Sequence, residues 1–198
     1  MVPPELAAAL VEAGRSMDVR GWVPGSAGNL SARLNYDRVA ITRSGVHKGK
    51  LQAEADIIVV DYQGLPAVEG QKPSAETLLH CQIYRLFPLV GAVLHGHSVA
   101  ATILSRLGSI TFSEYELLKA FGFSTHEVEV DLPVYENDQD IARLVKLIEP
   151  GLRNEPPIGY VIMGHGVYAW GTNVEHALWR LEALEFLLTC ELERRKMK

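Results

Sequence analysis

Three histidines stand at the ends of strand-like runs, and two of them are separated by a single residue. His95 and His97 close the apolar run VGAVLHGHS, in which residues i and i+2 project from the same face of an extended strand. A His-Gly-His sequence alone is equally typical of two ordinary polar residues, so a third ligand is required. His165 follows the apolar run YVIM and lies between two glycines, which leave room for close backbone approach to a ligand. Three neutral imidazoles with an open position are typical of a catalytic Zn²⁺ site, although Fe²⁺, Co²⁺, Mn²⁺ and Ni²⁺ accept the same ligands.

Two glutamates could supply acid–base chemistry. Glu76 is expected one turn into a helix that starts at Ser74. It is therefore either an acid that stabilises the helix N-terminus or a functional group, acting as a proton acceptor or as a further metal ligand. Glu116 lies in SEYELLKAFG, where an amphipathic helix would expose some glutamates regardless of function. His80 lies four residues after Glu76 and could share a metal with it. We expect it to be a surface or hydrogen-bonded side chain instead, like His47, His126 and His176.

Three segments rich in small residues could bind an anion. Asn29 follows a glycine in SAGNLSAR, Ser44 and Gly45 lie in ITRSGVHKGK, and Ser74 is expected to begin a helix. Glycine turns, short polar side chains and a helix N-terminus together can bind phosphate without a Walker or dinucleotide motif, and neither motif is present. Each segment alone is typical of an ordinary turn. The phosphate interpretation depends on their joint occurrence upstream of the histidines.

The order of expected elements is that of an α/β protein with one sheet between helices. Runs bounded by Gly, Asn, Asp or Pro in the first third of the chain predict hairpins of an antiparallel sheet. Strands are expected at 30–34, 39–42, 57–61, in VGAVLHGHS, and at 127–132, 159–163 and 166–170. Helices are expected at 4–19, in SAETLLHCQIYRLFP with Ser74 as N-cap, in VAATILSRLG, and at 114–121, 139–148 and 174–195.

Length and composition predict one globular domain over residues 1–198. The chain is 47% hydrophobic and 22% charged, which excludes a disordered protein. A net charge of −5, with a single basic cluster at 194–196, makes a nucleic-acid partner unexpected. No apolar run approaches the ~18 residues of a membrane span and the N-terminus lacks a basic signal region, so we expect a cytoplasmic protein with no membrane partner. Cys81 and Cys190 are expected to be buried thiols, not a disulfide scaffold.

Along nearly the whole chain, the segments GNLSAR, ITRSG, KPSAE, HGHS and GHGVYAWG resemble, in that order, the class II aldolase and adducin-head family. The resemblance implies a three-layer αβα fold around a central, largely antiparallel sheet. It implies one Zn²⁺ per subunit, bound by His95, His97 and His165, and a homotetramer with active sites between subunits. It also implies a small sugar-phosphate substrate whose phosphate contacts Asn29, Ser44, Gly45 and Ser74.

Two features distinguish the chain within this family. Aldolases of the group tend to have two serines before the glutamate matching Glu76, whereas this chain has Ser74 and Ala75, which removes one hydroxyl contact. Glu116 lies 19 residues after His97, about where fuculose-type aldolases have a catalytic tyrosine. A glutamate there, in a segment like EYELLKAFG, resembles the methylthioribulose-1-phosphate dehydratases of methionine salvage.

The resemblance to the dehydratases implies that Glu116 removes the C3 proton of the sugar phosphate and assists loss of the C4 hydroxyl as water. Glu76 would tune the metal or relay a proton. Tyr115 is adjacent to Glu116, and a shift of one residue would restore an aldolase-like tyrosine. The alternatives are therefore a class II aldolase or epimerase and, from a different class, a non-catalytic adducin-like interaction domain. Such a domain has no chemical need for three convergent imidazoles.

Overall fold

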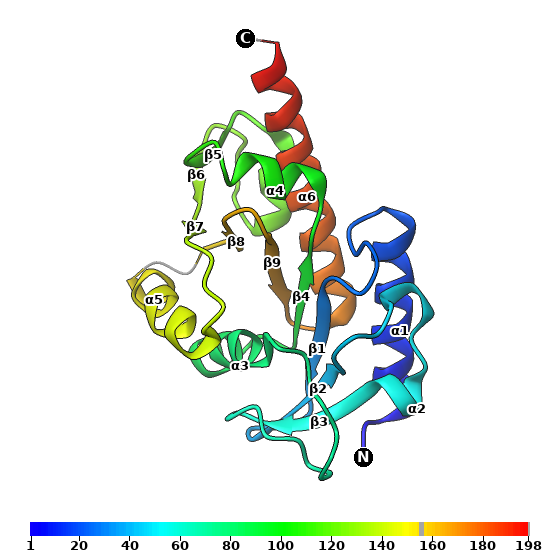
Figure 1. Cartoon of the computed structure of the whole chain (residues 1–198). Coiled ribbons are helices and arrows are strands. Elements are labelled where there is room, and N and C mark those ends of the chain that lie inside the picture. The colour runs from blue at the N-terminus through cyan, green and yellow to red at the C-terminus, as the bar shows by residue number, and fades with distance from the viewer. Residues whose placement is uncertain (155–156, 198) are drawn as a thin grey trace.

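A β-sheet lies between two layers of helices, and the computed structural model describes residues 1–154 and 157–197 (Figure 1). The main sheet contains β1 (Asn29–Arg33), β2 (Arg38–Thr42), β3 (Ile57–Asp61), β4 (Ala92–Gly96), β7 (Val134–Tyr135), β8 (Tyr160–Ile162) and β9 (Gly166–Gly171). Their spatial order is β3-β2-β1-β4-β9-β8-β7, and every neighbouring pair is antiparallel except β7 and β8. The largely antiparallel α/β fold predicted from the sequence is therefore confirmed.

Helices cover both faces of this sheet, on either side of β4 and β9 in Figure 1. One face is covered by α1 (Pro4–Val19) and α6 (Val174–Lys196), the other by α3 (Thr77–Leu86) and α5 (Ile141–Asn154). Adjacent residues of β4 point to opposite faces, so Leu94 packs in the core with α1 and α6 while Val93 packs with α3 and α5. The shorter helices are η1 (Lys48–Lys50), α2 (Ala53–Asp56), α4 (Val99–Leu104) and η2 (Glu116–Phe121).

The prediction of buried thiols is confirmed for one of the two cysteines. Cys81 and Cys190 are both free thiols, and Cys81 is buried, as predicted, whereas Cys190 is partly exposed. Within the residues that the structure describes, no helix combines the length and apolar character needed to cross a bilayer.

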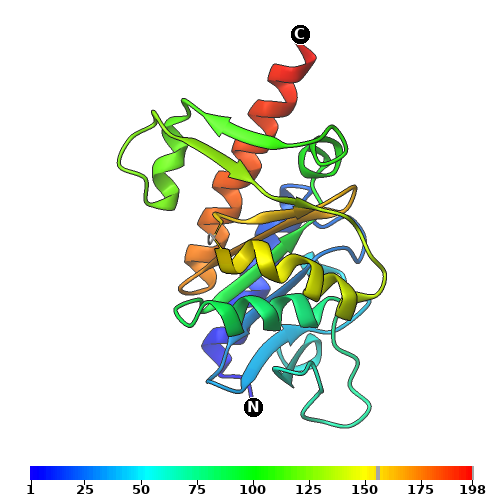
Figure 2. The same ribbon diagram turned by 90° about the vertical axis from the view of Figure 1, so that its left-hand side faces the viewer.

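An arm of the chain projects beyond the main sheet. It consists of η2 together with the antiparallel pair β5 (Ile110–Ser113) and β6 (Glu129–Leu132), and Figure 2 shows it reaching outward near the C-terminal part of α6. The helix expected at 114–121 is shorter, because Glu114 has a left-handed φ of 61° that a right-handed helix cannot contain. The strands β5 and β7 were not expected, and α5 continues past its expected end.

The predicted Ser74 N-cap is wrong. Helix α3 begins at Thr77, and Glu76 occupies the N-cap position without a capping side-chain bond. Ser74 Oγ instead accepts a hydrogen bond of 2.9 Å from Asn29 Nδ2, so it is directed toward β1 and makes no capping bond to the helix. As a result Glu76 lies at the start of the helix, not one turn into it.

Arg33 holds the end of α3 against β1. Its Nε donates to the carbonyl of Val90 at 2.7 Å, and its Nη2 donates to the carbonyls of Tyr84 (2.9 Å) and Phe87 (3.1 Å). The guanidinium also lies 4.9 Å from the centre of the Tyr84 ring. Carbonyls at a helix C-terminus have no partner within the helix, so this one side chain supplies donors to the last carbonyls of α3.

We expect Arg33→Met to lower the free energy of unfolding by about 2–3 kcal/mol, because it leaves these carbonyls without a charged donor. Urea denaturation of the purified variant measures the change. Arg38→Met on the neighbouring strand is the control. Among the described residues the Arg38 side chain makes only an exposed ion pair of 3.7 Å with Asp37, so its substitution should cost about 0–1 kcal/mol. Equal effects of the two substitutions would contradict the role given to Arg33.

Candidate metal centre

The three histidines singled out in the sequence converge at one end of the central strands. His95 lies in β4, His97 directly follows that strand, and His165 lies in the turn between β8 and β9. Because β4 and β9 pair antiparallel, with Gly96 opposite Val167, the turn before β9 lies beside the end of β4. The ring centres are 4.6 Å apart for His95 and His97, 4.5 Å for His97 and His165, and 5.1 Å for His95 and His165.

Glu76 joins this cluster from the start of α3. One ligand atom from each of the four residues lies within 4.8 Å of the others. The Glu76 carboxylate is 2.9 Å from His165 Nε2 through Oε1 and 3.3 Å from His95 Nε2 through Oε2. Three imidazoles and a carboxylate fit a divalent metal ion of the zinc or iron type.

The tautomer of His95 supports the fit to a cation. His95 is fully buried, and its Nδ1 donates to the carbonyl of Val167 at 3.0 Å, so in the neutral ring Nε2 carries a lone pair. That nitrogen has no hydrogen-bond partner within the described part of the chain, yet it faces Glu76 Oε2, which is also an acceptor. Two buried acceptors at this distance are stable together only with a cation or a proton between them.

The ionisation of the cluster favours a metal over a proton. Burial lowers the pKa of His95 to about 4, against the opposing effect of Glu76. Burial and then the charges of His95 and His165 lower the pKa of His97 to about 3. Burial raises the pKa of the Glu76 carboxyl, but the nearby His95 and His165 and the hydrogen bond from Asn29 outweigh it, so the pKa falls below its ordinary value. Near neutral pH His95 and His97 are therefore neutral imidazoles and Glu76 is a carboxylate, the forms that bind metals.

Close packing around the cluster depends on Gly166 and on an aromatic ring that the sequence analysis did not single out. A Cβ on Gly166 would lie 2.2 Å from the carbonyl oxygen of Gly96 and 2.9 Å from His95 Cε1, so only glycine fits. Tyr168 stacks on His95 with ring centres 4.0 Å apart. His95 and Tyr168 are register partners in β4 and β9, so the strand pairing is the signal that would have found this contact.

A directional hydrogen-bond chain fixes the amide of Asn29. Its Nδ2 donates to Ser74 Oγ at 2.9 Å and to Glu76 Oε2 at 2.6 Å, and its Oδ1 pairs with His80 Nε2. Because Oδ1 is an acceptor, His80 carries its proton on Nε2, and its Nδ1 accepts from Ser31 Oγ at 2.7 Å. His80 is therefore a buried, hydrogen-bonded side chain that orients Asn29 and is not a member of the metal cluster.

The candidate phosphate residues lie on adjoining segments. Asn29 contacts Ser74 directly, as described above. The backbone N–H of Ser44 donates to the carbonyl of Lys72 at 2.9 Å, which places Ser44 and Gly45 beside the segment that leads to Ser74. Gly45 is exposed and has a φ of 78°, so the turn presents its backbone to solvent. The structure thus brings together segments that are 45 residues apart in the chain.

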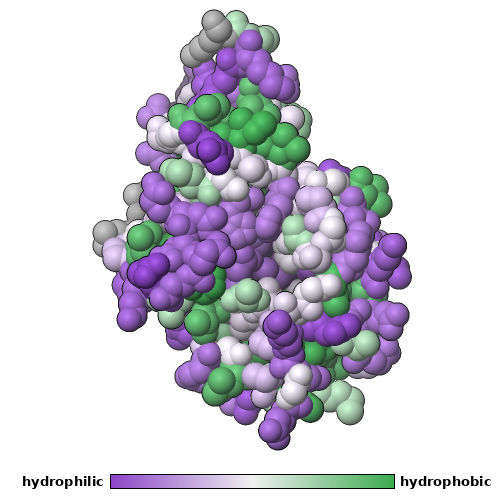
Figure 3. Space-filling model, in the orientation of Figure 1, coloured by the Kyte–Doolittle hydropathy of each residue, from purple (hydrophilic) through white to green (hydrophobic). Residues whose placement is uncertain are grey.

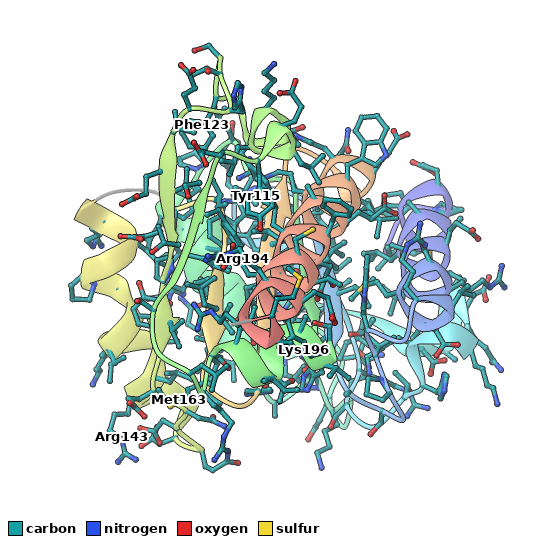
Figure 4. All side chains as sticks on the ribbon, turned by 90° about the horizontal axis from the view of Figure 1, so that it is seen from above. Tyr115, Phe123, Arg143, Met163, Arg194 and Lys196 are labelled. Carbon is teal, nitrogen blue, oxygen red and sulfur yellow. The ribbon has the colours of Figure 1, made fainter. Side chains whose placement is uncertain are left out.

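Glu116 is not part of the cluster within one subunit. It lies on η2 with its side chain 72% exposed, and its Oε1 pairs with Lys119 Nζ at 2.6 Å. Tyr115, the alternative residue, donates its hydroxyl to Glu191 Oε1 at 2.9 Å, and Glu191 in turn binds Arg194. Figure 4 shows Tyr115 and Arg194 on the same side of α6. The tyrosine hydroxyl is thus held by Glu191, whereas the Glu116 carboxylate lies at the surface, paired with Lys119.

His80 should make the metal-free protein acid-sensitive. Burial lowers the pKa of His80 to about 4 from 6.5, so between these values the unfolded chain binds a proton that the folded chain does not, and stability falls as the pH falls. We expect His80→Gln, which cannot titrate, to reduce the loss of unfolding free energy between pH 7 and pH 4.5 by about 2–3 kcal/mol. Urea denaturation at the two pH values measures this difference. Identical losses in the two proteins would show that His80 does not carry it.

The chain matches a known family along most of its length. The model of the Class II Aldolase and Adducin N-terminal domain family matches residues 8–192. Two relatives named methylthioribulose-1-phosphate dehydratase are similar to it. One, from Acidiphilium cryptum, is 60% identical over an alignment that covers 96% of this chain and 90% of the relative's length. The other, from Granulibacter bethesdensis, is 57% identical over 99% of this chain and 95% of its own.

A solved structure gives the same result for the fold. The L-fuculose-1-phosphate aldolase of Thermus thermophilus superposes with a TM-score of 0.78 at 25% identity, covering 98% of this chain and 96% of that one. The family model and the two relatives each cover more than nine-tenths of the chain. The chain therefore belongs to the class II aldolase and adducin N-terminal domain family.

Proposed function

We propose that this protein is a cytoplasmic methylthioribulose-1-phosphate dehydratase that binds one Zn²⁺ per subunit through His95, His97 and His165. It would convert 5-methylthioribulose 1-phosphate to 2,3-diketo-5-methylthiopentyl 1-phosphate in methionine salvage. The observation that carries the proposal is the convergence of these imidazoles with Glu76, in a chain 57–60% identical to relatives of that name.

The residues of the cluster prepare a Lewis-acid site. A divalent cation held there would polarise the carbonyl at C2 of the substrate and make the proton on C3 more acidic. His95 is held in its binding orientation by the hydrogen bond to Val167 and by stacking on Tyr168. Glu76 is held by Asn29, and its carboxylate is positioned to tune the metal or to relay a proton.

The phosphate would bind to Asn29, Ser44, Gly45 and Ser74. This group does not react, so its binding energy serves to align C3 and C4 with the catalytic groups. The contact between Asn29 and Ser74, and the position of Ser44 beside the same segment, support one anion site next to the metal centre. The amide of Asn29 would contribute to both sites, because one of its N–H groups already reaches Glu76.

Glu116 of a neighbouring subunit is the proposed general base. The C3–H bond breaks and the proton passes to this carboxylate. A C3–C4 double bond forms as the C4–O bond breaks, and the hydroxyl leaves with a proton as water. The enol at C3 then tautomerises to the ketone, with C4 gaining a proton. The exposed position of Glu116 on the projecting arm supports this assignment, as does the engagement of Tyr115 by Glu191.

A homotetramer with active sites between subunits is part of the proposal. Side chains that are apolar and exposed occur on α4 and α6: Val99, Ile103, Trp179 and Phe186. Figure 3 shows apolar surface gathered in the upper part of one face, around these helices, above a mainly hydrophilic middle. Exposed apolar surface of this kind is typical of a subunit interface, and a polar middle suits a sugar phosphate.

The zinc-loaded protein should convert methylthioribulose 1-phosphate to a product with diketone absorbance. We expect His97→Ala to lose both the bound metal and this activity, because it removes one of three imidazole ligands. His176→Ala, which changes a histidine outside the cluster, is the control and should retain both. Metal analysis and the absorbance assay measure the two effects. Cleavage of fuculose 1-phosphate without diketone formation would instead favour an aldolase, and a stable protein that binds no metal would favour an interaction domain.

Glu116→Gln should retain metal and fold but lower kcat by about 10²–10⁴, the usual contribution of general acid–base catalysis. Glu114→Gln, on the same arm, is the matched control. Co-expression of Glu116→Gln with His97→Ala tests whether each site uses two subunits. Random mixing should restore up to about a quarter of the activity, because some sites then combine intact histidines with an intact glutamate. No recovery in mixed oligomers would contradict the intersubunit site.

A further inference from the structure

Lys48 is a buried lysine to which the proposed reaction gives no role. Its side chain is 2% exposed, and its Nζ donates to the backbone carbonyls of Ser26 at 2.8 Å and Val46 at 2.7 Å. Neither acceptor is charged, and among the described residues no carboxylate forms an ion pair with it. Burial of an ammonium without a counter-ion destabilises a protein, so the position calls for a function.

One carbonyl belongs to the loop that leads to Asn29, and the other to the loop that carries Ser44 and Gly45. Ser26 lies three residues before Asn29, and Val46 directly follows Gly45. Both loops reach the surface, since Ser26 and Gly45 are exposed, whereas Lys48 lies beneath them. The ammonium therefore lies behind the loops, on the side away from solvent.

The backbone that carries Lys48 cannot easily move. A Cβ on Gly14 of α1 would lie 2.4 Å from the carbonyl oxygen of Lys48, and a Cβ on Gly49 would lie 2.1 Å from Asp18 Oδ2. Helix α1 and η1 are thus packed so closely that glycine is needed at both points. This packing, with the two hydrogen bonds of Nζ, makes the ammonium a fixed charge.

The field of this charge extends to the metal centre. The carboxylate of Glu76 raises the pKa of Lys48, against the larger lowering by burial, and the net pKa is about 8. The charge of Lys48 in turn contributes to the lowered pKa of His97. Lys48 is therefore mainly protonated at pH 7, and its charge interacts with Glu76 and His97 of the metal centre.

A phosphate monoester carries a charge of about −1.5 to −2 at neutral pH. The four candidate phosphate residues, Asn29, Ser44, Gly45 and Ser74, are all neutral. We propose that Lys48 is the specificity-determining positive charge of the phosphate site and selects a doubly charged phosphate ester over a singly charged end group. It acts from behind the two loops, without needing to touch the substrate. This inference rests on the proposed function, because it requires the phosphate to bind there.

A pair of ligands with the same shape and different charge tests the inference. Methyl phosphate is mainly a dianion at pH 7.0, since its second pKa is about 6, whereas methyl sulfate is a monoanion of the same tetrahedral shape. Both are titrated into the zinc-loaded protein, and binding is followed by NMR chemical shifts. We expect the wild-type protein to prefer methyl phosphate, and Lys48→Met to weaken methyl phosphate at least about 10-fold and methyl sulfate much less.

Lys50→Met is the matched control, because Lys50 lies in the same turn and is exposed. It should leave both affinities unchanged. If Lys48→Met does not fold, Lys48→Gln removes the charge while keeping an N–H donor for the loop carbonyls. Weakening of both ligands by the same factor would show that Lys48 only ties the loops together, and an unchanged affinity for methyl phosphate would also overturn the inference.

The same titrations separate this inference from the proposed function. If the wild-type protein dehydrates methylthioribulose 1-phosphate and Lys48→Met retains its preference for the dianion, the inference alone fails. If the wild-type protein binds neither ester, the phosphate site itself is wrong, and the inference fails with it.

Discussion

Two hydrogen-bond acceptors, His95 Nε2 and Glu76 Oε2, face each other inside this protein, and the rest of the site depends on the cation that belongs between them. Neither group can turn away. The opposite nitrogen of His95 is bound to the Val167 carbonyl, and the carboxylate is held by Asn29, which is itself oriented by His80. In the metal-free protein this arrangement destabilises the folded state, and a bound cation removes the destabilisation. Metal binding and folding are therefore coupled.

The antiparallel sheet explains how residues distant in the chain meet at this point. Strands β1, β4 and β9 are neighbours, and they bring Asn29, His95 and the turn of His165 to one end of the sheet. The register pairs Asn29 with His95, while the missing side chain of Gly166 lets the backbone of β9 approach β4. In an antiparallel sheet of this kind, residues that are neighbours on adjacent strands form the site. The hydrogen bonds between the strands therefore fix the positions of the ligands.

The sequence predicts those parts of the site that depend on local geometry. The spacing of His95 and His97 follows from the two-residue period of a strand, and glycines mark the turn at His165. It does not predict the start of α3, because the hydroxyl of the expected cap, Ser74, contacts Asn29, which is 45 residues away in the chain. The burial of Lys48 also cannot be predicted from the sequence. Its partners are backbone carbonyls of two loops, and these require no particular residue types. The start of α3 and the burial of Lys48 therefore depend on tertiary contacts, which the local sequence pattern does not specify.

The charges in the proposed site balance in a way that links its two ligands. Within the protein, the carboxylate of Glu76 is offset by the ammonium of Lys48, and His95 and His97 are neutral near pH 7. A dication bound alone would leave the site strongly positive, and a phosphate dianion bound alone would leave it strongly negative. Together they restore neutrality in a region of low dielectric constant, where an uncompensated charge is most costly. Each ligand therefore stabilises the binding of the other, and by linkage the effect is equal in both directions.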